Sequence, residues 1–443
     1  MRLLSPTVLA AALACLALSA PAAAGPAAYA PGRVVVAYRD SGGAPDPATE
    51  RVLRVAPGTV RATVARLRSE PGVAYAAPDP IAHISDAAPL PDDPGIRNYP
   101  GGLAALQWNL FGPWGVDALD AWGNLPASAR GARGIRVAVL DTGVAYRNLG
   151  RFRRSPDFAA ATFAAPWDFV ADTPYPVDRN GHGTHVAGTI AEATDNGIGV
   201  AGLAWGATII PVRVLDAQGY GDAATIAKGI RYAVRHGARV INMSLEFSTS
   251  VRAAEIPDIT QALRYANRRG VIVVGSTGNE GQAQVAYPAR TGLVISVGAT
   301  TDDGCLADFS NDGVGLDLVA PGGGDDASLS RDPHCQPGRH GRDIVQMTYT
   351  DSVGRFGLPS GYDGTSMAAP HVSATAALVL ASGVLGRAPT PGQVECRLKA
   401  TARVLGLPRP NRVYGYGLVD AGAATSPGVQ TPQCLTSAAR KAT

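Results

Sequence analysis

Charge is scarce in this chain of 443 residues. Asp, Glu, Lys and Arg make up 17% of it, against about 25% in an average soluble protein. The formal net charge is +3, and Lys and Arg are scattered along the sequence without forming a basic stripe. We therefore expect no binding to nucleic acid or to an anionic membrane. The 53 Gly, 34 Pro and 46% hydrophobic residues are typical of a loop-rich globular protein.

A membrane-spanning run is also missing from the body of the chain. Residues 368–385 are apolar, but Pro370 and His371 interrupt them, so a buried helix is expected. Residues 1–24 differ, because Arg2 is followed by a short apolar run and then by small residues that resemble a cleavage site. This pattern predicts a secretory signal peptide and an extracellular or periplasmic protein. An N-terminal anchor helix is the alternative.

No pair of cysteines has the C-x-x-C spacing of a zinc site. Cys15 belongs to the signal peptide, and four cysteines remain, an even number suited to an oxidising compartment. Three pairings are possible. Proximity in sequence favours Cys305 with Cys335 and Cys396 with Cys434, and free thiols are the alternative.

The chain divides into two parts in the sequence. Residues 25–88 form a small α+β module, with strands predicted at Arg33–Tyr38 and Val73–Ala76 and a helix at Thr59–Glu70. Residues 89–102 are rich in Pro, Gly and Asp and predict an exposed linker. This order is typical of a precursor with a removable N-terminal part, and an accessory domain is the alternative.

Residues 103–425 form the large domain, and 426–443 a C-terminal tail. Unbroken Val- and Ile-rich strands alternate here with amphipathic helices, which predicts an α/β fold with a mostly parallel sheet covered by helices on both faces. Ligands of such sheets bind at the carboxyl ends of the strands. The strands are predicted at 135–140, 208–215, 240–245, 271–274 and 294–297, and the helices at 184–193, 222–236 and 258–269.

Four polar residues stand out, and three of their positions fall where such a fold places its site. Asp141 ends the first strand, Asn279 follows a later one, and His182 and Ser366 each stand at the start of a helix. A serine hydroxyl needs an adjacent base, histidine can be that base near neutral pH, and a carboxylate can orient the imidazole. The N–H of Ser366 and the amide of Asn279 could both face an oxyanion.

Each of these residues also has a structural interpretation. A lone Asp-Thr-Gly is often a turn, and a serine at a helix start is often a cap. His185 is expected to be structural, and no zinc site is expected with His182, because the H-E-x-x-H pattern is missing. Gly181 and Gly183 beside His182 are expected to let a substrate approach closely.

Together, the four motifs resemble those of the subtilisin-like serine proteases (subtilases, peptidase S8), in the family's order Asp, His, Ser. The similarity runs from about Gln107 to Ala423. It implies a secreted serine endopeptidase that acts on proteins and peptides through an acyl-enzyme, with Asn279 in the oxyanion hole. A catalytically silent binding protein and a secreted esterase are the alternatives, but no motif is lost and the esterase G-x-S-x-G elbow is absent.

The resemblance extends to the front of the chain. Residues 25–88 are similar to an I9-type inhibitory propeptide, which implies an autoprocessed precursor inhibited by its own propeptide. The cut would fall between His83 and about Gly102. The mature protein is expected to be a monomer.

The segment 194–200 resembles the family's calcium loop, which implies a structural Ca²⁺. Asp157 fits least well, because the loop after Asp141 is long and rich in Arg, and a turn without metal is the alternative. The implied ligands are the side chains of Gln107, Asp157 and Asn196 and the carbonyls of Thr194, Ile198 and Val200.

Ser244, Leu245 and Glu246 resemble the strand that pairs with the substrate backbone. The family commonly has Gly where Glu246 stands, so we expect Glu246 at the pocket rim to favour a basic residue before the cleaved bond. A solvent-facing Glu246 is the alternative. Ala286 would leave the pocket floor uncharged, which favours apolar residues.

Overall fold

The structure is a computed structural model that describes residues 29–43, 49–80, 89–328 and 335–429. It divides into two compact units between Ser85 and Asp86. The predicted signal peptide, most of the C-terminal tail and Cys434 lie outside the described residues.

The small unit is a three-stranded antiparallel sheet with one helix. The order β2-β1-β3 is built from β1 (Tyr29–Tyr38), β2 (Arg51–Arg54) and β3 (Val73–Pro80), and α1 (Val60–Arg68) follows η2 (Pro57–Thr59). Val60, Val64 and Leu67 of α1 pack on Val34 and Val36. The strand–helix–strand order expected from the sequence is present. β2 was not predicted, because this four-residue edge strand is largely exposed and has no apolar alternation.

The large unit is built on an eight-stranded sheet in which all strand pairs are parallel. The strand order is β11-β10-β9-β8-β4-β7-β5, with β6 also pairing with β7. This confirms the predicted fold class. The strands are β4 (Arg136–Asp141), β5 (Thr162–Phe163), β6 (Trp167–Asp168), β7 (Thr208–Arg213), β8 (Val240–Met243), β9 (Ile272–Ser276), β10 (Ile295–Thr300) and β11 (Leu318–Pro321).

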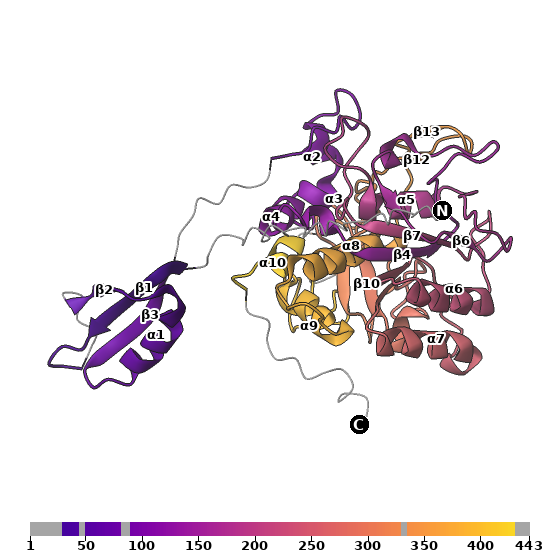
Figure 1. Ribbon diagram of the computed structural model, residues 1–443. Coiled ribbons are helices and arrows are strands. Elements are labelled where there is room, and N and C mark those ends of the chain that lie inside the picture. The colour runs from indigo at the N-terminus through magenta and orange to yellow at the C-terminus, as the bar shows by residue number, and fades with distance from the viewer. Residues whose placement is uncertain (1–28, 44–48, 81–88, 329–334, 430–443) are drawn as a thin grey trace, which may run out of the picture. The chain divides into compact units, whose positions relative to one another are not determined.

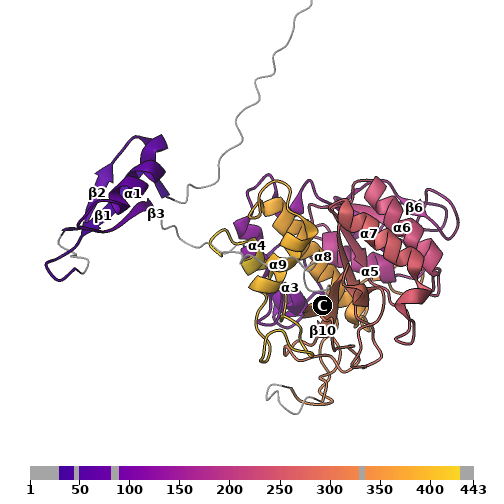
Figure 2. The same cartoon turned by 90° about the horizontal axis from the view of Figure 1, so that it is seen from below.

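Alternate residues of β4 pack on opposite faces of the sheet. Val137 and Val139 join the core beneath α5 (His182–Ala191) and α8 (Thr365–Ser382), whereas Ala138 and Leu140 join the core beneath α6 (Ala223–Arg235) and α7 (Pro257–Arg268). Figure 1 shows α6 and α7 together, away from α5 and α8, and Figure 2 again shows α6 beside α7. Both faces are therefore buried, which explains the unbroken apolar strands.

Shorter elements complete the large unit. The remaining helices are α2 (Gly102–Leu106), α3 (Trp108–Phe111), α4 (Ala118–Asn124), α9 (Pro391–Thr401) and α10 (Ala421–Thr425), and β12 (Thr348–Tyr349) and β13 (Phe356–Gly357) form a hairpin. Single 3₁₀ turns are η3 (Arg130–Ala132), η4 (Pro156–Phe158), η5 (Ala253–Glu255) and η6 (Ala289–Thr291). No helix within the described residues is long and apolar enough to cross a membrane.

The buried helix expected at 368–385 is α8, which begins three residues earlier. Its residues from Thr365 to Val379 are buried, Pro370 included. A disulfide joins Cys305 and Cys335, whose Cα atoms are 5.5 Å apart. Cys396 is also disulfide-bonded, but the pairing predicted for it involves Cys434, outside the described residues.

The segment 89–102, predicted to be an exposed linker, is held to the large unit at one point. Most of its residues are exposed, but the Asp93 side chain is buried. Its carboxylate accepts hydrogen bonds from the backbone N–H groups of Asp195 (2.9 Å) and Asn196 (3.1 Å). An acidic side chain that looked solvent-exposed in the sequence thus fixes this segment to the loop at 194–200.

Candidate active site

The carboxylate of Asp141 lies at the carboxyl end of β4, the end at which parallel sheets bind their ligands. It is fully buried, and its Oδ1 contacts Nδ1 of His182 at 2.8 Å and accepts from the Thr142 N–H at 2.7 Å. Its Oδ2 is buried and has no hydrogen-bond partner among the described residues. The carboxylate is thus aimed at one edge of the imidazole.

His182 is the first residue of α5. Its side chain keeps 26% of its surface exposed, so one edge of the ring remains accessible. Burial alone opposes a charged imidazole, but Asp141, with smaller effects from Asp178 and Glu246, outweighs it and raises the pKa of His182 above the ordinary value. The ring is thereby suited to accept a proton.

Gly183 has a different role from the one expected. A Cβ there would lie 2.2 Å from the carbonyl oxygen of Gly143 and 3.0 Å from Oδ1 of Asp141. The missing side chain therefore lets α5 approach the end of β4, and this close packing brings His182 to Asp141. Its role is in packing within the protein, and not in access for a substrate.

Asp178 is a site residue that the sequence analysis missed. Its Oδ1 accepts from the N–H groups of Asn180 and Gly181 and from Oγ1 of Thr142, and its Oδ2 accepts from Thr184. It is fully buried. The carboxylate therefore ties the start of α5 to the residue after Asp141. An Asp four residues before a helix start was the signal that could have revealed it.

Ser366 lies in the first turn of α8, after Gly364, whose φ of 151° favours glycine. Ser366 and His182 line the same cavity of about 410 Å³. No hydrogen bond joins these two side chains among the described residues, because Oγ of Ser366 instead donates to the carbonyl of Ser244 at 3.4 Å. Catalytic hydrogen bonds are often long or unformed in ligand-free sites.

Asn279 is oriented by the residue before Ser366. Its Oδ1 accepts from the N–H (2.8 Å) and Oγ1 (2.9 Å) of Thr365, so its Nδ2 points elsewhere. A Cβ added to Gly364 would lie 3.6 Å from the backbone N of Ser366 and 3.7 Å from Nδ2 of Asn279. Two donors thus border the space that glycine leaves open, the arrangement that an oxyanion requires.

Comparisons with known proteins agree with this geometry. The model of the subtilase family (peptidase S8) matches residues 132–417. The chain belongs to the subtilase family. It is 38% identical to subtilisin Savinase of Lederbergia lenta over 315 residues, which is 71% of this chain and 98% of that protein. It is 38% identical to a thermostable alkaline protease of Halalkalibacterium halodurans over 317 residues, 71% of this chain and 73% of that protein.

A solved structure gives the same result for the fold. A protease from Pseudoalteromonas arctica matches with a TM-score of 0.60 and 29% identity, over 76% of this chain and 99% of that one. The subtilase described here is therefore a serine-type endopeptidase of protein substrates. The secreted-esterase alternative is thereby excluded.

The residues that were expected to pair with the substrate lie beside Ser366, but β8 ends at Met243, so they follow the strand instead of belonging to it. Ser244, Leu245 and Glu246 line the same cavity as His182 and Ser366. Ala286 is not among its lining residues; its side chain is buried, and its N–H donates to the carbonyl of Thr277.

The Glu246 carboxylate is partly buried and lies close to Asn279. Its Oε1 is 3.5 Å from Nδ2 of Asn279, and its Oε2 is 3.4 Å from Oγ of Ser276. Burial and then repulsion by Glu280 raise the pKa of Glu246. No Lys or Arg pairs with Glu246 within the part of the chain that the structure describes.

Hydrogen bonds tie the loop at 194–200 and the next residue, Ala201, to Asp157 and Gln107, two of the predicted metal ligands. Oδ1 of Asp157 accepts from Nδ2 of Asn196 (3.0 Å), and its Oδ2 accepts from the N–H of Val200 (2.8 Å). The Gln107 amide pairs with both backbone groups of Ala201 at 2.8 Å. Burial, with repulsion from Asp93, raises the pKa of Asp157 to about 7.

His185 is a structural residue in this subtilase, as expected. It is fully buried, its Nε2 contacts the carbonyl of Ile344 at 2.9 Å, and its ring stacks on Tyr362 at 4.2 Å. Burial lowers its pKa to about 3, so it stays neutral.

Proposed function

We propose that Ser366 is the nucleophile of this endopeptidase, with His182 as general base and Asp141 as the residue that orients it. The 2.8 Å contact between Asp141 and His182, beside the cavity that His182 shares with Ser366, carries this proposal. Before attack, Oγ of Ser366 turns from the carbonyl of Ser244 toward the imidazole, a rotation about its Cα–Cβ bond.

The reaction then follows from these positions. Oγ attacks the substrate carbonyl carbon while its proton passes to Nε2 of His182. The oxyanion accepts hydrogen bonds from the Ser366 N–H and from Nδ2 of Asn279. The imidazolium returns the proton to the leaving amine, the C–N bond breaks, and an acyl-enzyme remains. Water, deprotonated by the same imidazole, hydrolyses it.

The chain is further proposed to be made as a secreted, autoprocessed precursor. The signal-like residues 1–24 support secretion. The boundary between two compact units at Ser85 and Asp86 supports a removable inhibitory unit at 25–88, with cleavage between His83 and Gly102.

A structural Ca²⁺ is proposed at the loop 194–200. The carbonyls of Thr194, Ile198 and Val200 accept no hydrogen bond from any described residue, and Val200 is fully buried. No cluster of three or more His, Cys, Asp or Glu side chains in the described ranges could hold a metal, so the metal would depend on amide and carbonyl oxygens, which suit Ca²⁺. When bound, it would stabilise the folded loop. Gln107, Asp157 and Asn196 would add side-chain oxygens.

Glu246 is proposed to favour a basic residue before the cleaved bond. Its carboxylate lacks a cationic partner among the described residues and lines the cavity beside Ser366. A substrate guanidinium or ammonium would supply that partner, and it would also draw Glu246 away from the oxyanion donor Asn279.

Labelling with a fluorophosphonate probe tests the catalytic roles. The purified mature protein, from which the proposed inhibitory unit has been removed, should be labelled on Ser366, and labelling should be lost in His182→Ala protein prepared in the same way. His371→Asn is a control outside the proposed machinery, because His371 is fully buried and contacts Asn109. Labelling on another serine, or undiminished labelling of His182→Ala, would overturn the proposal.

A further inference from the structure

Folding gathers arginines that are scattered in the sequence. Arg231 and Arg235 of α6 and Arg264 and Arg268 of α7 line one hollow of about 530 Å³. Arg268 also lines an adjoining hollow of about 810 Å³. Together these side chains form what we call the arginine band: Arg231, Arg235, Arg239, Arg264, Arg268 and Arg269.

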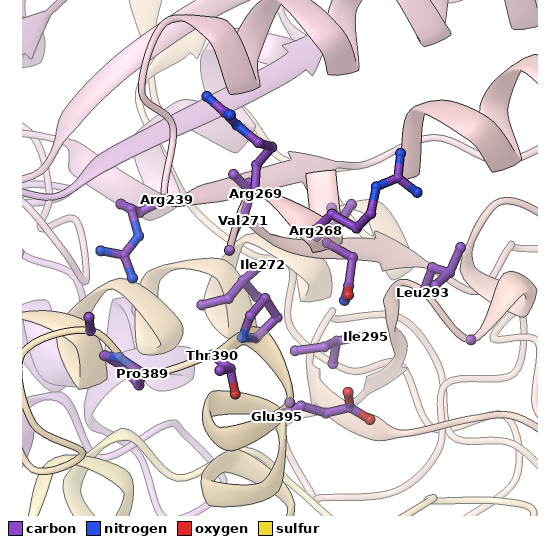
Figure 3. Close-up of a pocket in the computed structure, with 17 residues that line it drawn as sticks. Arg239, Arg268, Arg269, Val271, Ile272, Leu293, Ile295, Pro389, Thr390 and Glu395 are labelled. Atoms are coloured by element: carbon purple, nitrogen blue, oxygen red, sulfur yellow. The ribbon is translucent and has the colours of Figure 1, made fainter. Parts of the chain in front are cut away.

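The second hollow is drawn in Figure 3, with Arg239, Arg268 and Arg269 around it. The one acidic residue that lines it, Glu395, pairs with Lys399 at 2.5 Å. None of the six arginines forms an ion pair with any described residue, and Arg231 contacts only a backbone carbonyl, that of Asp258 at 3.2 Å. These arginines form no stripe along the sequence, and only the packing of α6 on α7 and the strand starts beside them brings the six together.

The band includes two like-charged pairs at spacing i, i+4, Arg231 with Arg235 and Arg264 with Arg268. Such pairs destabilise a helix. The negative end of the helix dipole compensates Arg235 and Arg268, which lie in last turns, but Arg231 and Arg264 lie one turn earlier. A bound anion would offset the charge repulsion within both arginine pairs.

The arginine band lies at the amino ends of the strands, whereas the active site lies at their carboxyl ends. Arg239 directly precedes β8 and Arg269 comes just before β9, so both lie at the amino ends of strands. Asp141 and Asn279 lie at or just beyond the carboxyl ends of β4 and β9. A ligand on the band would therefore leave the catalytic cavity open.

The kind of ligand follows from the side chains. All six are arginines, whose planar forks pair with sulfate and phosphate oxygens in a bidentate way. Two hollows that share Arg268 in their lining suit several anionic groups on one polymer. Among the described residues, no large exposed apolar side chain lines either hollow. The one aromatic side chain there, Tyr265, is half-buried. The hollows therefore lack the row of exposed aromatic rings that stacks bases and the apolar wedge that enters a bilayer.

We propose that the arginine band is an exosite for an acidic polysaccharide that carries sulfate or phosphate groups. Such binding would hold the protease on a polyanionic matrix while its catalytic cavity stays accessible. The proposal is independent of the roles assigned to Ser366 and His182.

Heparin, a sulfated polysaccharide, is the probe for a direct test. Binding of the full-length protein is measured as a function of salt concentration. The parent is the Ser366→Ala protein, which prevents self-digestion. The band variant adds R235Q/R264Q/R268Q to this parent, and the matched control adds R147Q/R151Q/R153Q. The second triple removes the same charge from exposed arginines of another segment. Gln keeps a helix propensity close to that of Arg.

The band variant should bind heparin at least about tenfold more weakly, and its slope of log K against log salt should fall by on the order of one per lost contact. The matched control should stay within about twofold of the parent. Equal losses in both triples would show an effect of net charge alone and overturn the exosite. Failure of the parent to bind heparin would do the same.

The same binding measurement is made with two other ligands, a double-stranded DNA fragment and vesicles of phosphatidylglycerol. If either binds in a band-dependent way more tightly than heparin, the polysaccharide assignment is wrong. Thermal unfolding of each variant shows that the band variant is folded, because these exposed side chains are not in the core.

Discussion

Ser244 is joined to the backbone carbonyl of Ser366, the proposed nucleophile, by a hydrogen bond. Oγ of Ser244 donates to the carbonyl of Ser366 at 2.7 Å. That carbonyl would ordinarily accept from the N–H four residues later in α8, but this residue is Pro370, which has no N–H. The proline thus leaves this carbonyl without its helical donor, and the Ser244 hydroxyl supplies one.

Ser244→Ala should therefore destabilise the large unit. The buried carbonyl of Ser366 would lose its partner, at a cost of about 1–3 kcal/mol. Urea unfolding in a His182→Ala background, which prevents self-digestion, measures this. The control is Ser250→Ala, whose exposed hydroxyl contacts only that of Ser248. Equal stability of the two variants would contradict the role given to Ser244.

The acid limb of activity should lie at a higher pH than an ordinary histidine would give. The active imidazole is neutral, and its raised pKa means that protonation inactivates the enzyme at a higher pH than an ordinary histidine would. Because the Glu246 charge contributes to the raised pKa, Glu246→Gln should move the limb to lower pH. Glu280→Gln is the control, since Glu280 is not among the charges that raise this pKa. A kcat/KM profile from pH 5 to 9 measures both, and an unshifted limb in Glu246→Gln would refute the coupling.

Asn279→Ala should reduce kcat by roughly 100- to 1000-fold, the range known for removing one oxyanion donor from a subtilisin, with KM little changed. The amide acts on charge that develops in the transition state. Thr365→Val tests the orientation of the amide, because it removes one of the two hydrogen bonds to Oδ1 and keeps the backbone one. It should reduce kcat less than Asn279→Ala. A main effect on KM in Asn279→Ala would argue against an oxyanion role.

The sequence was sufficient for the parallel sheet and for the position of Asp141, because buried strands and strand ends leave a local pattern. For Asp178 it held one local signal, an Asp four residues before a helix start, but not the role, because the five hydrogen bonds form only when the loop before α5 closes on Thr142 and Thr184. It also missed the arginine band, since Arg231 and Arg264 are 33 positions apart and become neighbours only when α6 packs on α7.

Charge at Glu246 should control the residue preferred before the cleaved bond. With matched peptides that differ only in that residue, Glu246→Gln should lower kcat/KM for Arg and Lys by about tenfold or more. For Phe it should be unchanged or higher, because the Asn279 amide is no longer shared with a carboxylate. The ratio of Arg to Phe is the readout. Probe labelling of Ser366 with an unchanged ratio would refute the specificity role and leave the catalytic proposal intact.

Chelation should lower the thermal stability of the large unit if the loop 194–200 holds Ca²⁺. An ion that binds only the folded state at 100 times its Kd stabilises by about 2.7 kcal/mol. The melting temperature of His182→Ala protein should therefore rise with Ca²⁺ and fall with EDTA. Asp157→Asn should abolish most of this dependence, because it removes the negative charge that faces Asn196 and Val200. Asp216→Asn, at an exposed turn, is the matched control and should keep it. A melting temperature that does not depend on Ca²⁺ in the parent protein would mean that the hydrogen bonds of the loop hold it closed without a metal.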